Sequence, residues 1–275
     1  MSWHGWSIEP PLAYVAVAAL LYWAPARGRT YRRGAQSPWC TAAFAGGLVT
    51  IVLALDSPLD GYADTLFWAH MSQHILLLTV APPLILLGRP WPRMWQALPL
   101  RSRTRIGRTL ALSRWAAPVR QLAHPIPAFV LFNVTIIAWH IPAAYNATLS
   151  SGAIHNLEHA MFFFTGLLFW ARVIDPGPLR PRLPWLGRVA YVVGAMIVGW
   201  VIAITLVLVP EPIYSHYALL AHRPGGISAL TDQQIAAGIM WVPGSLSYGI
   251  AMMLGFYRWL EPDSASHPPQ RALTT

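Results

Sequence analysis

The chain has 275 residues, of which 55% are apolar and only 11% are charged. Soluble globular domains carry about 25% charged residues, and a soluble domain this poor in charge would expose large apolar patches and aggregate. This composition therefore excludes an ordinary soluble domain and favours a membrane protein, as do the 14 Trp residues, because Trp concentrates at membrane–water interfaces.

The net charge of +9 does not indicate binding to nucleic acid. Every basic residue is Arg, and the Arg residues occur in short clusters between apolar runs, which is typical of loops that face anionic lipid. The one cysteine, Cys40, excludes a disulfide within the chain and a cysteine-rich metal site.

Seven apolar segments are expected to cross a membrane, because a hydrocarbon core of about 30 Å takes about 20 helical residues. In chain order they are Pro11–Ala26, Trp39–Leu55, Leu66–Leu87, Ile126–Ile141, Ala153–Val173, Val189–Val209 and Ile235–Leu260. We expect an all-α membrane protein, a seven-transmembrane-helix bundle over residues 1–260. The proline-containing tail over residues 261–275 is expected to be disordered.

The distribution of Arg predicts the orientation of the bundle. Eighteen of the 19 basic residues lie in the first, third and fifth connections, after the last segment, or in the adjoining ends of the fifth and seventh segments (Arg172 and Arg258), and only Arg223 lies in an alternate connection. The positive-inside rule then places the N-terminus outside the cytoplasm and the C-terminus in it. The first segment has no basic residue before it and Arg after it, so we expect a retained helix and not a cleaved signal peptide.

Five of the 10 His residues are expected in the outer halves of the membrane helices. His70 and His74 form one His-x-x-x-His pair, and His155 and His159 form another. Residues four apart share one helix face about 6 Å apart, and two imidazoles there can bind one metal ion. The pairs lie at similar depth, so the third and fifth helices are expected to be neighbours that supply up to four nitrogen ligands.

Other residues at comparable depth are candidates for the same site. His140 in the fourth segment and Met240 in the seventh are candidate additional ligands. Glu158 and Asp232 are candidate carboxylates that orient an imidazole or offset the charge of the metal. A single membrane histidine often only hydrogen-bonds a neighbour, but ionisable residues in membrane spans are rare and usually functional, so the matched pairs favour a metal or haem site.

Imidazole ligands suit copper, zinc and iron, and a site of histidines with an optional thioether favours copper. Cu(I) is expected over Cu(II), because a single charge costs less to hold in a low-dielectric span. Two histidines from separate helices can instead bind a haem iron from both sides. The spacing leaves copper and haem open.

Three stretches resemble one known family. They are His70-Met-Ser-Gln-His74 continuing to Gly88-Arg-Pro90, His155-Asn-Leu-Glu-His159 continuing to Gly166-Leu-Leu-Phe-Trp170, and Asp232-Gln-Gln234 continuing to Ile239-Met-Trp-Val-Pro-Gly244. Together they resemble the multi-spanning CtaG family of cytochrome c oxidase assembly factors. The resemblance implies a multi-pass protein of the bacterial inner membrane. It also implies a copper chaperone that delivers the metal to a haem–copper oxidase and is not an enzyme. Its expected partners are oxidase subunits, membrane lipid and a periplasmic copper donor.

Three other classes of protein also have histidines in membrane helices or seven such helices. A haem-binding redox protein would use the paired histidines as axial ligands. A transporter is disfavoured because the inner halves of the helices are almost without polar residues. A retinal protein is excluded, since it needs a Schiff-base lysine and the chain has no Lys. Gly238, Gly244 and Gly249 are expected to let the seventh helix approach its neighbours closely.

Overall fold

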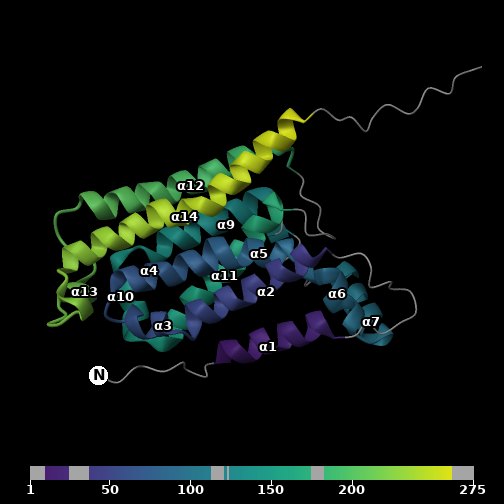
Figure 1. Ribbon diagram of the computed structural model, residues 1–275, viewed down its shortest axis with the longest axis horizontal. Helices are drawn as coiled ribbons and strands as arrows, with labels where there is room; N and C mark the ends of the chain where they lie inside the picture. Colours follow the sequence, from purple (N-terminus) through teal and green to yellow (C-terminus); the bar gives the residue numbers. More distant parts are fainter. Residues whose placement is uncertain (1–9, 25–36, 113–120, 123, 175–182, 262–275) are drawn as a thin grey trace, which may run out of the picture.

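A computed structural model describes residues 10–24, 37–112, 121–122, 124–174 and 183–261. All regular structure among these residues is helical (Figure 1). The predicted disordered tail lies outside the described residues from position 262 onward. The expected all-α architecture is therefore confirmed for the described part of the chain.

Several helices begin at a proline, for example Pro38, Pro125 and Pro142, where the missing N–H leaves no donor unsatisfied. The helices are α1 (Pro10–Trp23), α2 (Pro38–Leu55), α3 (Pro58–Ala63), α4 (Phe67–Ile75), α5 (Ala81–Leu87), α6 (Pro90–Ala97), α7 (Leu100–Leu112), α9 (Pro125–Trp139), α10 (Pro142–Ser150), α11 (Gly152–Val173), α12 (Trp185–Leu208), α13 (Ser215–Ala218) and α14 (Ala229–Leu260). A π-helical turn, η2 (Leu76–Val80), joins α4 to α5, and a 3₁₀ turn, η4 (Pro224–Gly226), precedes α14.

Among the described residues, four helical stretches are long and apolar enough to cross a membrane: Pro38–Ala63, Phe67–Leu87, Trp185–Leu208 and Ala229–Leu260. A fifth crossing results if α9 and α10, which are bent by 73° at their junction, count as one span. Helix α11 has 22 residues, but His155, Asn156, Glu158 and His159 make it more polar. These helices support the prediction of a membrane protein. The number of seven crossings and the orientation of the termini stay predictions.

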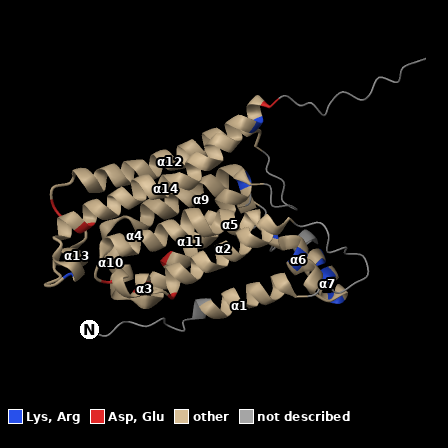
Figure 2. Cartoon of the chain, in the orientation of Figure 1, with Lys and Arg blue, Asp and Glu red and all other residues tan. Residues whose placement is uncertain are grey.

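Charge separates the two ends of the bundle. The basic residues of α6, α7 and the last turns of α14 lie at one end, and most of the described acids lie toward the opposite end or in the interior (Figure 2). We call the first the Arg-rich end. This asymmetry between the ends is the pattern expected of a protein oriented by the positive-inside rule.

The span from α4 to α5 is interrupted where Pro82 and Pro83 remove two backbone donors. The carbonyl of Leu78 would have no partner in a regular helix, because the residues four and five positions later are these prolines. The indole Nε1 of Trp170 in α11 donates to that oxygen at 3.1 Å. The π-helical turn is therefore tolerated inside the bundle, because α11 supplies the hydrogen bond that the Leu78 carbonyl would otherwise lack.

Gly166 allows α11 to approach the interrupted turn. A Cβ added there would lie 2.9 Å from the carbonyl oxygen of Leu78 and 3.0 Å from Cγ of Pro82. Gly166→Ala is therefore expected to destabilise the protein by about 1–3 kcal/mol, the usual cost of overpacking. The measurement is thermal unfolding in detergent, with Gly199→Ala as the control.

The control is matched in kind, because Gly199 is also a helical glycine and a Cβ there meets nothing within 4 Å. Its replacement should raise stability slightly, since alanine costs less backbone entropy in a helix than glycine. Equal melting temperatures for the two variants would contradict the close contact at Gly166.

The expectation for the glycines of α14 is correct at one position. A Cβ on Gly244 would lie 2.8 Å from Cδ1 of Ile75, so this glycine does permit close packing against α4. At Gly238 and Gly249 nothing lies within 4 Å of an added Cβ, and the prediction is wrong there. Gly255, which was not predicted, allows α14 to contact Val189 of α12 instead.

Candidate metal site

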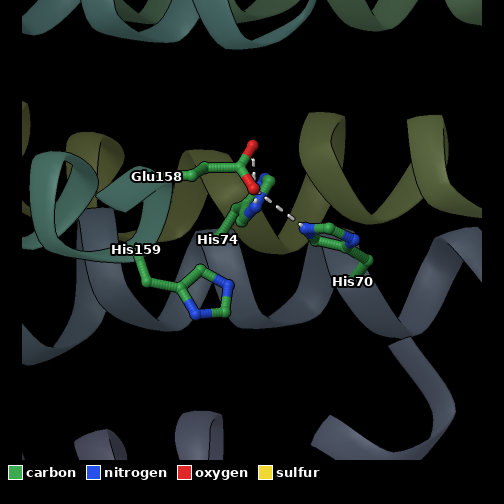
Figure 3. A group of neighbouring side chains, drawn as sticks. All are labelled: His70, His74, Glu158 and His159. Atoms are coloured by element: carbon green, nitrogen blue, oxygen red, sulfur yellow. Dashed lines mark hydrogen bonds and ion pairs between the residues drawn. The ribbon is translucent and has the colours of Figure 1, made fainter. Parts of the chain in front are cut away.

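Four side chains from two helices converge in the interior of the bundle. Helix α4 contributes His70 and His74, and α11 contributes Glu158 and His159 (Figure 3). One nitrogen or oxygen atom from each lies within 4.8 Å of those from the other three. All four residues are buried, with exposed fractions between 0% and 5%. We call these residues the metal cluster.

The predicted packing of the third and fifth segments is confirmed by these contacts. The ring centroids of His74 and His159 lie 5.7 Å apart, and those of His70 and His159 lie 6.0 Å apart. The spacing of four residues placed both α4 imidazoles on the face that meets α11, as helix periodicity requires. The role of these residues as ligands stays a prediction.

Glu158 lies between the two α4 histidines. Its Oε2 is 3.3 Å from Nε2 of His70, and its Oε1 is 3.5 Å from Nε2 of His74. The sequence predicted that this carboxylate orients an imidazole or offsets the charge of the metal. In the structure one of its oxygens lies within 4.8 Å of a nitrogen of each of the three histidines, so it belongs to the group of candidate donors itself.

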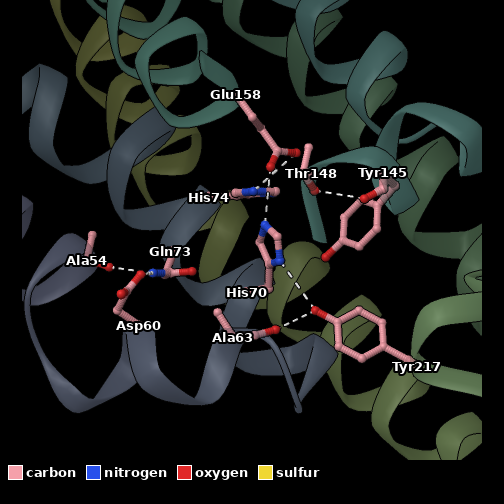
Figure 4. Close-up of polar contacts among 10 residues, drawn as sticks. All are labelled: Ala54, Asp60, Ala63, His70, Gln73, His74, Tyr145, Thr148, Glu158 and Tyr217. Carbon is pink, nitrogen blue, oxygen red and sulfur yellow. Dashed lines mark hydrogen bonds and ion pairs between the residues drawn. The ribbon is translucent and has the colours of Figure 1, made fainter. Parts of the chain in front are cut away.

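The hydrogen bonds of Tyr217 assign the tautomer of His70. The Tyr217 hydroxyl donates its one hydrogen to the carbonyl of Ala63 at 2.5 Å, and it also lies 3.3 Å from Nδ1 of His70 (Figure 4). Because that hydrogen is already used, Nδ1 must be the donor in the second contact. The lone pair of His70 therefore lies on Nε2 and faces Glu158.

Two acceptors thus face each other 3.3 Å apart, at Nε2 of His70 and Oε2 of Glu158. Such a contact is favourable only when a cation lies between the two atoms, either a proton or a metal ion. Further buried polar atoms have no hydrogen-bond partner in the described structure: both ring nitrogens of His74, of which a neutral ring offers one as an acceptor, Nε2 of His159 and Oε1 of Glu158. Leaving one such group unsatisfied costs about 1–3 kcal/mol, so the donor set fits a bound cation.

His155 and His140 lie beside the metal cluster. The ring of His155 is half-buried, 4.8 Å from that of His70 and 4.2 Å from that of His159, measured between centroids. The ring of His140 lies 6.4 Å from that of His74, and its Nδ1 donates to the carbonyl of Ile136 at 2.7 Å. In both residues Nε2 is buried and has no described partner.

His140 owes its position to the bend between α9 and α10. It ends α9 with φ −87° and ψ −4°, and Pro142 starts α10 in a new direction. The carbonyl of His140 accepts a hydrogen bond from the Tyr214 hydroxyl at 3.1 Å. The broken helix thereby directs an imidazole toward the cluster without leaving a backbone oxygen unsatisfied.

Met240 and Asp232 are not among the four converging residues. Met240 packs against an apolar cluster that includes Phe67, Met71 and Tyr145. The carboxylate of Asp232 accepts hydrogen bonds from the backbone N–H groups of Phe67 at 2.8 Å and Trp68 at 3.0 Å. Asp232 in α14 therefore caps the start of α4, the helix that carries His70 and His74, and is not itself one of the converging donors.

Sequence reasoning missed the residues that hold the site in place. Tyr217, from the connection before α14, contacts His70, and the amide of Gln73 donates to the carbonyl of Ala54 and to Oδ1 of Asp60, both at 2.7 Å (Figure 4). Gln73 is fully buried and anchors α4 to α2 and α3. The one signal in the sequence was an amide side chain inside an apolar span, directly before His74, because such a group needs hydrogen-bond partners.

The fold and the cluster together define a class: an all-helical membrane protein with three histidines and a carboxylate buried between two helices. Over residues 13–262 the chain matches the family described as cytochrome c oxidase caa3 assembly factor. The chain belongs to this family, and the resemblance found in its three sequence stretches is confirmed. The match includes all four residues of the metal cluster.

Curated relatives in mycobacteria are similar over most of the chain. Uncharacterised proteins of Mycobacterium bovis and Mycobacterium tuberculosis are each 26% identical over 245 residues, and one of Mycobacterium leprae is 25% identical over 244 residues. The alignments cover 86% of this chain but only 36% of each relative, so the chain spans about a third of their length. No solved structure matches the chain.

Proposed function

We propose that this protein holds a copper ion at the metal cluster and supplies it during assembly of a haem–copper oxidase, without catalysing a reaction. The observation that carries the proposal is the convergence of His70, His74, His159 and Glu158 in the interior of the bundle. Membership of the assembly-factor family supplies the process. The subunits of the oxidase are the proposed recipients, and a periplasmic copper protein is the proposed donor.

Charge favours the monovalent ion. Three neutral imidazoles and one carboxylate carry a single negative charge, so Cu(I) makes the buried site neutral, whereas a dication leaves one net charge. An uncompensated charge in a low-dielectric interior is expensive. Imidazole nitrogen also binds copper well, which is consistent with the donor set.

The distances favour a single ion over haem. Haem bound through one histidine of each pair would need room for the macrocycle between the two axial nitrogens. In the structure Glu158 lies against both α4 histidines, and the rings of His70 and His74 are 4.5 Å apart. The same space accommodates an ion whose ligands bind at about 2 Å after small side-chain shifts.

His155 supports a route between the cluster and the surface. It is half-buried, whereas His159 and His70, with which its ring is in contact, are buried. An ion could therefore pass to His155 by exchanging one imidazole ligand for another. This half-buried residue is the proposed point of transfer to and from partner proteins.

Metal analysis of the detergent-purified protein tests the proposal. About one copper per chain is expected after loading with Cu(I) under reducing conditions, with no haem absorbance near the Soret region. Zinc binding in place of copper would change the identity of the ion but keep the site. A stoichiometric Soret band that disappears in histidine variants would contradict the copper proposal and favour haem.

Tyr217→Phe is expected to weaken copper binding about 10-fold, because residues that orient a ligand typically contribute 10- to 100-fold to metal affinity. Without the hydroxyl, Nδ1 of His70 loses its acceptor and the imidazole can adopt the other tautomer. Competition with a chelator of known affinity measures the change. Tyr62→Phe, at an exposed tyrosine, is the control and should bind copper normally. Normal affinity in Tyr217→Phe would show that this hydroxyl does not orient His70.

A further inference from the structure

The π-helical turn η2 places one extra residue close to the metal cluster. The backbone N–H of Ala81 donates to the carbonyl of Leu76, five positions earlier, whereas a regular α-helix pairs residues four positions apart. The turn begins two residues after His74. Because an α-helix turns by about 100° per residue, the extra residue rotates α4 relative to α5 by about 100° compared with an unbroken helix.

Two prolines explain why the turn is wide. The ring of a proline inside a helix clashes with the carbonyl of the residue four positions earlier, which is Leu78 for Pro82 and Thr79 for Pro83. A wider turn relieves these clashes, but it cannot give the Leu78 carbonyl a backbone donor. The sequence therefore requires an interruption here, and the neighbouring helices determine its form.

The rotation of α5 is fixed by close contacts with two helices. A Cβ added to Gly47 of α2 would lie 2.6 Å from Cγ1 of Ile85. A Cβ added to Gly166 of α11 would lie 3.0 Å from Cγ of Pro82. Both glycines leave room for one particular side of α5, so a rotated α5 would bring other side chains against them.

The rotation of α4 is fixed by contacts of its own. Gln73 donates to the carbonyl of Ala54 in α2 at 2.7 Å, and Ile75 lies against Gly244 of α14. These residues use the sides of α4 that meet α2 and α14, so the side that bears the two histidines is left for α11. Since α4 and α5 each have their own partners, the turn between them must supply the angle that satisfies both.

Trp170 of α11 holds the turn in its wide form. Its indole Nε1 donates to the carbonyl of Leu78 at 3.1 Å, and its ring stacks on Tyr248 of α14 with centroids 5.5 Å apart. Trp170 and Leu78 are both buried. A buried carbonyl without a partner costs about 1–3 kcal/mol, so this hydrogen bond favours the π turn over conformations that direct the carbonyl elsewhere.

We propose that Trp170 is a positioning residue for the metal cluster and acts through η2. By holding the Leu78 carbonyl it keeps the extra residue in the turn, and the turn directs His70 and His74 toward the two candidate donors of α11. Trp170 follows His159 by 11 residues, or about three helical turns, so the two share a face of α11. One face of α11 therefore offers a donor and also aligns the helix that carries two others.

Trp170→Phe tests the role of the indole, because it keeps an aromatic ring but removes the donor. Copper affinity of the purified full-length protein is expected to fall about 10-fold, the lower end of the range for residues that orient metal ligands. Trp200→Phe is the matched control. It removes an indole that donates to Oγ of Ser245 at 2.7 Å, between α12 and α14, and should bind copper as the parent does.

Both variants are measured by competition with a chelator of known affinity, at a temperature well below the melting temperature of either. Unfolding then does not lower the measured affinity. Equal affinities in Trp170→Phe and Trp200→Phe would overturn the proposal.

The copper measurement rests on the proposed function, so a second measurement uses no metal. In a Cys40→Ser chain, His74→Cys and His159→Cys should be joined by a short reagent that links two thiols, because these side chains face each other. Adding Trp170→Phe should lower the linked fraction severalfold, and adding Trp200→Phe should not. An unchanged linked fraction would overturn the positioning role. A lower linked fraction in a protein that binds no copper would support it while contradicting the proposed function.

Deletion of Leu76, a half-buried residue, tests the turn itself. Without the extra residue a regular helix would join α4 to α5, and His74 would rotate by about 100° away from α11. The linked fraction of the cysteine pair should then be lost, whereas Leu76→Ala keeps the residue count and should retain it. Normal linking in a folded deletion variant would overturn the proposal. If the deletion variant does not fold, the comparison of Trp170→Phe with Trp200→Phe decides.

Discussion

Replacing His74 and His159 together with alanine is expected to abolish copper binding. Each residue supplies a buried imidazole from one of the two helices, and no other residue of the metal cluster can restore two lost ligands. Because residues behind metal ligands already contribute about 10- to 100-fold, the loss of two ligands should exceed about 100-fold in affinity. Copper per chain is measured in purified protein, and oxidase activity is measured in membranes of the host.

His222→Ala is the matched control, because it removes an exposed histidine without touching the cluster. It should keep both copper and oxidase activity. Retention of copper by the double variant would rule out this site. Loss of copper with full oxidase activity, at normal levels of inserted protein, would separate metal binding from assembly and leave a scaffolding role.

Asp232→Ala should produce the largest loss of stability outside the cluster, about 2–4 kcal/mol. The carboxylate is fully buried and satisfies two N–H groups at the start of α4, and each hydrogen bond to a charged group contributes about 1.5–3 kcal/mol. Nothing in α4 itself replaces it, since Leu66 at the cap position offers no side-chain hydrogen bond. Thermal unfolding in detergent measures the effect, and copper affinity should fall with it because α4 carries two of the proposed ligands.

Glu211→Ala provides the comparison for this variant. Glu211 is an exposed acid in the connection before α14, so its removal changes the net charge equally but breaks no buried contact. Its melting temperature should match that of the parent protein. If Asp232→Ala and Glu211→Ala unfold alike, the capping of α4 by Asp232 contributes little.

Local patterns predicted most of what depends on helix periodicity. The two His-x-x-x-His pairs sit on helices, and three of their four imidazoles join the metal cluster because residues four apart share a face. Glu158 was recognised as functional from its place in an apolar span, but its exact position among the ligands depends on side-chain packing. The sequence spacing could not show that it contacts both histidines of the other helix.

Contacts between distant parts of the chain could not be predicted. Asp232 and Phe67 are separated by 165 positions, and Tyr217 and His70 by 147, so no local pattern reports either contact. The prediction of close packing at Gly238 and Gly249 was wrong for a related reason. Small residues permit close helix packing, but which of them face a neighbour depends on the rotation of α14, and only Gly244 meets Ile75.

The polarity of α11 has a consequence for biogenesis. A charged residue costs up to about 2.5–3.5 kcal/mol on insertion into the bilayer, the value for the centre of a membrane helix, and α11 carries Glu158 in its first half beside two histidines. An isolated α11 is therefore a poor substrate for lateral release from the translocon into lipid. The contacts of Glu158 with His70 and His74 offset that cost only after α4 is already in place. The pairing of α4 with α11 thus forms the metal cluster and compensates the polar residues of α11 in the same step.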